Sequence, residues 1–258
     1  MAKGMKIDTR PRTKTRNLEE KPEKPRIQQK FSEIDRSDRI LLITTIIIFL
    51  LAEYMVYVFS PPEVNLGDNI RIIYLHIPAA WVSYLAFGIT FVSSLLYLRE
   101  KSDHYDLLSV SSVELGVLFC TIAIITGSIF SNATWGTYWN WDPRQTTTLI
   151  LWFGYAAYLS LRFATKDPEQ RARISAVLGV LIFPTVPLSY LSTRIYYSLH
   201  PIVIAGQEGG IAMVPEMGIT LLASVVAVTF LFIYLLRITL RIERTEIHLK
   251  IRKYEESY

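Results

Sequence analysis

The chain carries six long apolar runs separated by short polar segments, and these runs limit what it can fold into. Hydrophobic residues make up 51% of the 258 residues and charged residues 19%, and the two classes are segregated along the chain. A helix needs about 20 apolar residues to cross the hydrocarbon core of a membrane, and it satisfies its backbone polar groups internally. We therefore expect an all-α integral membrane protein with six transmembrane helices, formed by residues 40–59, 72–98, 107–130, 145–163, 174–190 and 217–236.

The segments around these runs complete the predicted organisation. The first 38 residues are rich in Lys, Arg, Glu and Pro, so they cannot bury enough apolar surface to fold alone, and we expect a disordered basic tail. This tail has no signal-peptide pattern, so the first run is expected to remain as an anchor. A six-helix membrane domain follows over 39–237, and a charged C-terminal tail over 238–258. Pro184 and Pro187 predict a kink in the fifth run.

Lys and Arg residues predict the orientation, because cytoplasmic segments retain them. Six crossings place both termini on one side, and 24 of the 27 Lys and Arg residues lie on that side. Both termini are therefore expected to be cytoplasmic. The basic N-terminal tail is suited to anionic lipid headgroups, so membrane lipid is an expected partner and nucleic acid is not.

The three remaining arginines mark the outer segments, and each lies near an unusual residue. Arg71 precedes His76 by five residues, and Arg194 precedes His200 by six. Arg144 ends the stretch WGTYWNWDPR, residues 135–144, which holds three of the five tryptophans of the chain. One outer surface should thus collect two histidines, three arginines and an aromatic cluster, with the tryptophan-rich loop between the third and fourth helices.

Each of these features has an ordinary explanation when it is taken alone. Tryptophans gather at membrane interfaces, a single histidine is more often structural than a ligand, and arginines at helix ends reach toward phosphates. Haem would use all of them together, since its iron takes imidazole, its plate stacks on indole and its propionates bind Arg. Zinc needs three or four ligands, so two histidines fit it less well. The residues show no nucleophile motif, because the only cysteine, Cys120, lies inside the third run.

The absence of a C-x-x-C-H sequence predicts how haem would be held. Without that motif the chain forms no thioether bonds to haem, so any haem is bound non-covalently, as haem b, and can be released. If residues 135–141 are helical, Trp135 and Trp139 share one face and form, with Trp141, a continuous aromatic floor.

Three motifs resemble one known family. The stretch from Trp135 to Arg144 fits the signature W-G-x-x-W-x-W-D-x-R of the haem-handling membrane proteins of cytochrome c maturation. The segments RIIYLHIPAAW, residues 71–81, and YSLHP, residues 197–201, are similar to the two histidine motifs of the smaller, CcmC-type haem-delivery proteins. The resemblance covers about residues 40 to 236. The chain departs from it at Tyr138, Tyr196 and Tyr197, where the family usually has tryptophan.

The resemblance implies a function and a site. It implies that His76 and His200 are the axial ligands of the haem iron, and that the tryptophan loop is the haem platform on the periplasmic side of the bacterial inner membrane. Haem would be delivered to the periplasmic chaperone CcmE, in a complex with the ATPase CcmA, the membrane subunit CcmB and the small protein CcmD. The chain itself would be a haem-delivery subunit and not an enzyme. The haem-binding residues expected on these grounds are Arg71, Trp135, Tyr138, Trp139, Trp141, Asp142, Arg144 and Arg194, together with the two histidines.

Two other functions compete with this interpretation. A cytochrome b-type electron carrier holds haem within the bilayer, whereas His76 lies only about one and a half helical turns past Arg71, which favours a shallow site. An ion or solute transporter could use Glu53 and Glu114, since acids inside membrane spans are often functional. These acids lie toward opposite ends of their runs, so neither is at the midplane.

Overall fold

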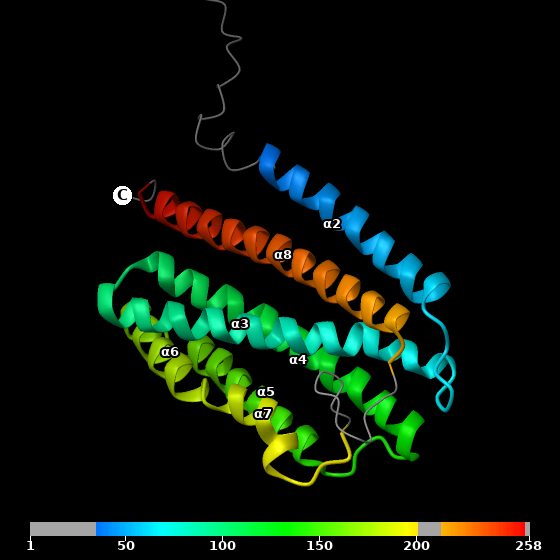
Figure 1. The fold of residues 1–258 in the computed structure, drawn as a ribbon. Coiled ribbons are helices and arrows are strands. Elements are labelled where there is room, and N and C mark those ends of the chain that lie inside the picture. The colour runs from blue at the N-terminus through cyan, green and yellow to red at the C-terminus, as the bar shows by residue number, and fades with distance from the viewer. Residues whose placement is uncertain (1–34, 201–212, 256–258) are drawn as a thin grey trace, which may run out of the picture. The chain divides into compact units, whose positions relative to one another are not determined.

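The computed structural model describes residues 35–200 and 213–255 and is all-α over these residues (Figure 1). Its α-helices are α2 (Arg36–Tyr54), α3 (Ile73–Glu100), α4 (Asp103–Trp135), α5 (Pro143–Ala164), α6 (Pro168–Ile182), α7 (Thr185–Ile195) and α8 (Pro215–Glu255). The π-helical turn η1 (Met55–Phe59) extends α2, and the 3-10 helix η2 (Asp68–Ile72) leads into α3. The described part contains no strand, only one antiparallel bridge between Glu63 and Gly67. The all-α part of the predicted fold class is confirmed.

Five helical stretches of the described chain are long and apolar enough to cross a membrane. They are Arg36–Phe59, Asp68–Glu100, Asp103–Trp135, Pro168–Ile195 and Pro215–Ile247. The predicted kink in the fifth apolar run is confirmed, because a turn at Phe183 and Pro184 separates α6 from α7. Six such stretches were predicted, and the one that is missing from these five is α5. Its N-terminal turns carry Arg144, Gln145 and three threonines, which lower its apolar content.

Helix α5 nevertheless runs beside α4 in the opposite direction, and its C-terminal end reaches the first turn of α4. A loop of seven residues joins the C-terminal end of α4 to the N-terminal end of α5. At the other end, Arg162 Nη1 and Nη2 donate to Asp106 Oδ1 and Oδ2, each at 2.7 Å, close to the start of α4. Its 22 residues correspond to about 33 Å, which is comparable to the thickness of a bilayer core.

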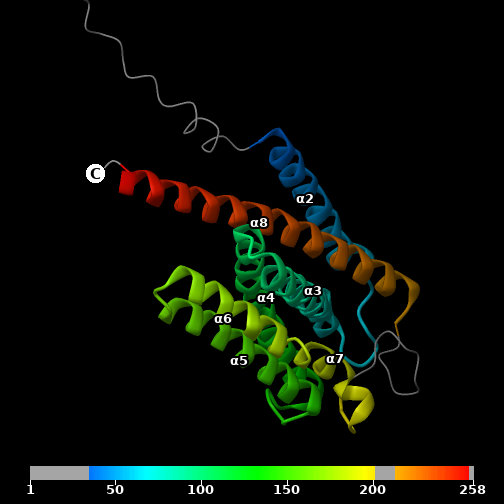
Figure 2. The same ribbon diagram turned by 90° about the vertical axis from the view of Figure 1, so that its left-hand side faces the viewer.

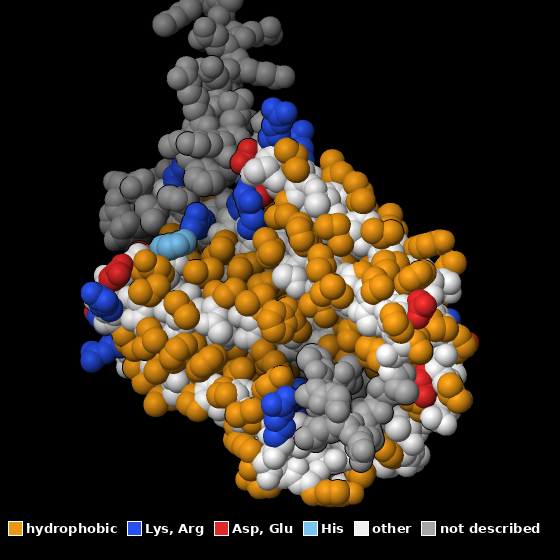
Figure 3. All heavy atoms as spheres, in the orientation of Figure 1, with side chains coloured by type: hydrophobic (Ala, Val, Ile, Leu, Met, Phe, Trp, Pro, Cys, Tyr) orange, Lys and Arg blue, Asp and Glu red, His pale blue; other side chains and the backbone are white. Residues whose placement is uncertain are grey.

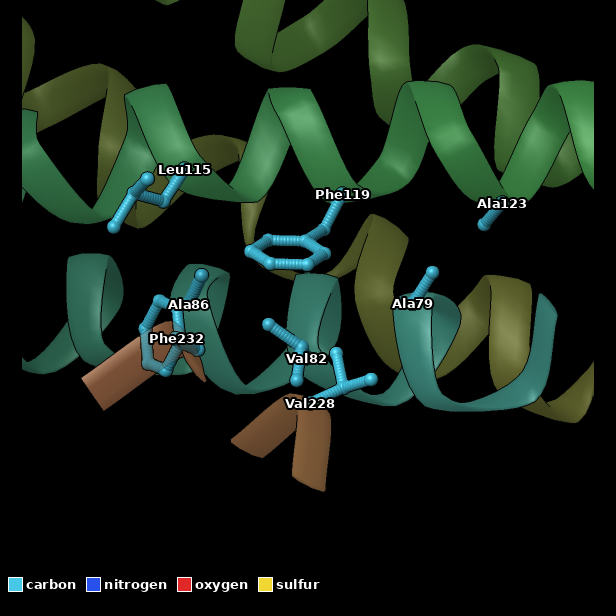
Figure 4. Packing of buried hydrophobic residues seen from close by; sticks show 8 residues of the cluster. All are labelled: Ala79, Val82, Ala86, Leu115, Phe119, Ala123, Val228 and Phe232. Atoms are coloured by element: carbon cyan, nitrogen blue, oxygen red, sulfur yellow. The ribbon is translucent and has the colours of Figure 1, made fainter. Parts of the chain in front are cut away.

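The centre of the helical bundle lies where α3, α4 and α8 meet (Figure 4). Phe119 of α4 and Phe232 of α8 contact edge to face, with ring centroids 6.4 Å apart. Small residues on α3 let the helices approach. The buried residues of this cluster are Ala79, Val82, Ala86, Leu115, Phe119, Ala123, Val228 and Phe232. A second cluster fixes α5 against α3, where the rings of Phe87 and Tyr155 stack with centroids 3.7 Å apart.

Helix α2 packs against α8: it runs beside α8 in Figure 1 and meets it at an angle in Figure 2. An ion cluster joins the two helices. The carboxylate of Asp38 is buried and pairs with Arg237 at 3.0 Å and with Arg241. The segment predicted as a C-terminal tail from residue 238 continues α8 as helix to Glu255. Residues 1–34 of the predicted N-terminal tail lie outside the described part of the chain. The last three residues of that predicted tail, 36–38, belong to α2.

Large hydrophobic side chains cover most of the face drawn in Figure 3. Along α2 they include Ile43, Ile47, Leu50 and Leu51, which are more than half exposed. Such a long exposed apolar face is expected where lipid replaces water as the solvent.

Candidate functional site

A pocket lies at the end of the bundle where α4 joins α5. It is a partly open hollow with about 720 Å³ of non-atom space, which includes solvent at its mouth. Its walls come from α3, α4, the loop after α4, the start of α5, and the segment that ends at His200. The lining residues are His76, Ala80, Ser83, Tyr84, Ala123, Ile124, Gly127, Ser128, Phe130, Trp135, Trp139, Asp142, Arg144, Gln145, Thr148 and His200.

His76 is held by two oxygen atoms of α4. Its Nδ1 lies 3.0 Å from the carbonyl oxygen of Ala123 and 3.2 Å from the hydroxyl of Thr126. A carbonyl oxygen only accepts, so Nδ1 carries the proton, and Nε2 of the neutral ring keeps its lone pair. Histidines that bind metals are commonly oriented through the second nitrogen in this way.

Gly127 lets α4 pass close to the His76 ring. A Cβ at this position would lie 2.8 Å from Cε1 and 3.2 Å from Nδ1 of His76, which is closer than carbon atoms approach. The ring therefore packs directly on the backbone of α4 and cannot move toward it.

The tryptophan-rich stretch is a loop and not a helix. Helix α4 ends at Trp135, and Gly136 follows with a φ of 74°, a left-handed conformation that ends helices. Residues 136–141 are not helical, so Trp135 and Trp139 do not share a helical face. The prediction that depended on a helix here is wrong. The loop still brings both rings to the pocket lining. Trp141, with a φ of 60°, packs edge to face on Trp139 and is 70% exposed outside that lining.

Asp142 connects the tryptophan loop to the histidine segment. It is buried and caps the N-terminus of α5, accepting from the backbone N–H of Arg144 at 2.8 Å. The same carboxylate accepts from Ser198 Oγ at 2.8 and 2.9 Å and from the Leu199 N–H at 2.7 Å. Ser198 Oγ in turn accepts from the His200 N–H at 3.1 Å. Asp142 thus positions the backbone that presents His200.

Arg144 joins α5 to α7 at the edge of the pocket. Its Nη1 donates to the carbonyl oxygens of Ser189 at 2.7 Å and Tyr190 at 3.1 Å. Its guanidinium lies 5.8 Å from the ring centroid of Tyr84 and 5.9 Å from that of Tyr190. These contacts hold a positive charge in the pocket wall, where an anionic group of a ligand would meet it.

Four of the residues expected to bind haem lie outside the pocket lining: Arg71, Tyr138, Trp141 and Arg194. Arg71 donates to the carbonyl of Val56 and pairs with Asp68 at 3.0 Å, so it joins the two short helices η1 and η2. Tyr138 is 60% exposed, and Arg194 is also exposed. Their role in haem binding stays a prediction.

The structure also brings in residues that the motifs did not indicate. Thr126 and Gly127 lie 50 residues or more from His76 in the chain, and only the helix packing places them beside it. Tyr84, Thr148 and Ser189 form a hydrogen-bonded group, with Ser189 Oγ 3.0 Å from the Tyr84 hydroxyl and 2.9 Å from that of Thr148. A helical-face analysis of α3 could have found Tyr84, which lies two turns beyond His76.

The two histidines line the same pocket, and the distance between their rings matches that expected for two ligands of one haem iron. Their ring centroids are 6.3 Å apart and their planes are inclined at 43°. Two metal–imidazole bonds of about 2 Å, extended to the ring centres, give a separation of about 6 Å. The inclination is no obstacle, because each ring can turn about its own bond to the metal. Among the described residues there is no group of three or more His, Cys, Asp or Glu side chains that could hold a metal ion alone.

Comparisons with known proteins identify the family of the chain. The family model described as heme exporter protein C (CcmC) matches residues 24–255. The chain belongs to the CcmC family. Heme exporter protein C of Bradyrhizobium diazoefficiens is 30% identical over 195 residues, which cover 76% of this chain and 74% of that protein. The protein of the same name from Escherichia coli K12 is 29% identical over 160 residues, covering 62% and 65% of the two chains. That from Rhodobacter capsulatus is 33% identical over 122 residues, covering 47% and 50%.

Membership of the CcmC family and the five apolar helical stretches make this chain a membrane protein. All three motif segments, with both histidines and the tryptophan loop, fall inside the matched region.

Proposed function

We propose that this protein binds haem between His76 and His200 at the periplasmic face of the bacterial inner membrane and delivers it to the chaperone CcmE. The observation that carries the proposal is the pair of imidazole rings 6.3 Å apart across one pocket. The description of the relatives and of the matching family model as heme exporter protein C supports haem as the cargo.

The remaining lining residues fit the other parts of haem. Trp135 and Trp139 supply flat apolar surface for the macrocycle, and Arg144 supplies a cation for a propionate. The chain offers no thioether attachment, since its one cysteine, Cys120, is buried in α4 and does not line the pocket. Haem held only by two imidazoles and by stacking can leave, as delivery requires.

The proposed orientation has six crossings, with both termini in the cytoplasm. Support for a sixth crossing comes from α5, which starts beside the pocket at Asp142 and ends beside Asp106 near the start of α4. Helix α4 is a candidate span, and α5 runs beside it in the opposite direction over about 33 Å, which supports a sixth crossing. The distribution of Lys and Arg then places the pocket outside.

The proposed partners are other proteins of the cytochrome c maturation system. CcmE would receive haem, while CcmA, CcmB and CcmD would form the complex in which this chain works. This chain would contribute haem binding and no catalysis.

Haem loading of the chaperone tests the proposal. CcmE co-expressed with the wild-type chain should carry haem. The Trp135→Ala/Trp139→Ala variant should load at least tenfold less, because base–aromatic stacking is worth roughly 1 to 3 kcal/mol per ring and we expect haem–indole stacking to be comparable. Trp81→Ala is the matched control, since Trp81 is half-exposed on α3 and does not line the pocket. Normal loading by the double variant, at equal membrane insertion, would reduce the tryptophan loop to an interfacial anchor.

A further inference from the structure

Helix α7 fixes two parts of the haem pocket, although its own residues, all of them within the described chain, lie outside the lining. Two of its backbone carbonyls, those of Ser189 and Tyr190, accept from Nη1 of Arg144 at 2.7 and 3.1 Å. Its C-terminal end at Ile195 leads directly to the segment that presents His200. A turn separates α7 from α6, so the contacts of α7 with its neighbours decide where these groups lie.

The side chain of Ser189 joins α7 to two other helices. It is buried, and its Oγ lies 3.0 Å from the hydroxyl of Tyr84 on α3 and 2.9 Å from that of Thr148 on α5. Thr148 donates to the carbonyl oxygen of Arg144 at 2.7 Å, because a carbonyl only accepts. A hydroxyl has a single proton, so Ser189 donates to Thr148 and Tyr84 donates to Ser189. This chain of hydrogen bonds runs from α3 through α7 to the backbone of Arg144.

The same contacts leave one edge of the Arg144 guanidinium for a ligand. Both hydrogen bonds from its side chain to α7 use Nη1 and occupy the N–H groups of that nitrogen. The other donors lie on the edge formed by Nε and Nη2, and such an edge binds a carboxylate through two parallel hydrogen bonds. The ring of Tyr84, with its centroid 5.8 Å from the guanidinium carbon, limits how far the group can turn.

We propose that Ser189 and Tyr84 are positioning residues that make the pocket selective for porphyrins with a free carboxylate. This inference rests on the proposed function. The hydroxyl chain holds α7 against α3 and α5, the carbonyls of α7 hold the guanidinium of Arg144, and its Nε–Nη2 edge keeps one orientation. A propionate accepts from both nitrogens of that edge. An esterified propionate has no charge and presents a single carbonyl oxygen, so it binds the edge less tightly.

Titration with two porphyrins tests this selectivity. The full-length protein is purified in detergent without haem and titrated with iron protoporphyrin IX or with its dimethyl ester, which keeps the iron and the ring. The Soret band reports binding of each. We expect the free acid to bind about tenfold more tightly than the ester, a ratio typical of a hydrogen bond to a charged group.

Arg144→Lys separates the orientation of the guanidinium from its charge. An ammonium is a point charge and does not offer the planar fork that takes both carboxylate oxygens. We expect the preference for the free acid to fall to about threefold or less, because one of the two parallel hydrogen bonds is lost. An unchanged preference would show that charge alone is sufficient, and would overturn the role of positioning.

Ser189→Ala tests the positioning itself. It keeps the backbone carbonyl that binds Arg144 and removes the hydroxyl that holds α7 to Tyr84 and Thr148. We expect the preference for the free acid to fall from about tenfold to about threefold, with the affinity for the ester and the bis-imidazole spectrum as in the wild type. Tyr84→Phe keeps the ring beside the guanidinium and should lose less. An equal loss of affinity for both porphyrins, or no loss for either, would overturn the assignment.

Tyr158→Phe and Ser109→Ala are the matched controls. Their hydroxyls form the same kind of buried pair, 3.0 Å apart, and both residues lie outside the pocket lining. Each variant should keep the wild-type preference. Controls that lose the preference as fully as Ser189→Ala would show that the effect does not come from the pocket wall, and would contradict the assignment.

The wild-type titrations also separate this inference from the proposed function. If neither porphyrin gives a bis-imidazole spectrum, the proposed haem site is wrong and the inference falls with it. If both give that spectrum with equal affinity, the haem site stands, and the selectivity assigned to Ser189 and Tyr84 is overturned.

Discussion

At the residue scale, the site depends on groups that hold the two histidines rather than on the histidines alone. His76 packs on Gly127 and is hydrogen-bonded to Ala123 and Thr126, and His200 follows a backbone held by Asp142. The motif residue Asp142 was expected to bind haem. The structure shows its carboxylate occupied with Arg144, Ser198 and Leu199, so it acts on the site through His200.

Gly127→Ala tests the contact with His76. The added Cβ would lie 2.8 Å from Cε1, so the ring or the helix must shift, and overpacking of this kind costs about 1 to 3 kcal/mol. We expect most haem to be lost on purification, as measured by haem per mole of protein. Gly88→Ala is the control, because a Cβ there meets nothing within 4 Å. Unchanged haem content in Gly127→Ala would mean that His76 does not need this packing.

Asp142→Asn tests the positioning of His200. Asparagine still caps a helix, but its NH2 group cannot accept from the Leu199 N–H. We expect the six-coordinate, low-spin haem spectrum to weaken toward a five-coordinate one, and added imidazole to restore it. Asp167→Asn makes the same change at the N-cap of α6, where the side chain accepts from the Gln170 N–H, and should leave the spectrum as it is. A wild-type spectrum in Asp142→Asn would remove the positioning role.

At the element scale, the sequence predicted the helices better than it predicted the loop between them. Apolar periodicity and length identify all six helical regions, because lipid allows few alternatives to a helix. The stretch 135–144 does not follow such a rule: Gly136 and Trp141 adopt left-handed φ values, which propensity alone does not reveal at a tryptophan. The contacts of Thr126 and Gly127 with His76 also depend on how α3 packs against α4, which no local pattern encodes.

The ion pair between Asp106 and Arg162 fixes the far end of α5 to α4. The side chains are 17% and 12% exposed, so removal of one partner leaves a poorly solvated charge. We expect Asp106→Asn or Arg162→Gln to lower the free energy of unfolding by about 3 kcal/mol, measured by thermal unfolding in detergent. The double variant should lose less than the sum of the two. Arg99→Gln, at an exposed site, should change stability by less than about 0.5 kcal/mol. Additive losses in the double variant would show that the two side chains act independently.

At the scale of the whole molecule, the proposed orientation rests on the distribution of charge, and the proposed sixth crossing rests on geometry. The Lys and Arg distribution was readable from the sequence, whereas the direction of α5 required the contacts at its two ends. The cavity beside Asp106, which is lined by residues of α4, α5, α6 and α8, could not have been predicted, because these helices lie far apart in the chain.

Phosphatase fusions test the orientation and the sixth crossing together. A periplasmic reporter fused after Thr137, in the loop before α5, should be active, and one fused after Asp167, between α5 and α6, should be inactive. Activity at both positions would show that α5 does not cross. Activity only after Asp167 would invert the molecule and move the pocket to the cytoplasm.

The visible spectrum of the purified protein, with and without each histidine, is the most direct test of haem held between His76 and His200. The wild-type protein supplied with haem should show a Soret band of the low-spin, bis-imidazole type. His76→Ala and His200→Ala should each lose that form, and free imidazole should restore part of it by filling the vacant position. The account is contradicted by a wild-type protein without a Soret band after haem is supplied, or by a His200→Ala spectrum identical to that of the wild type.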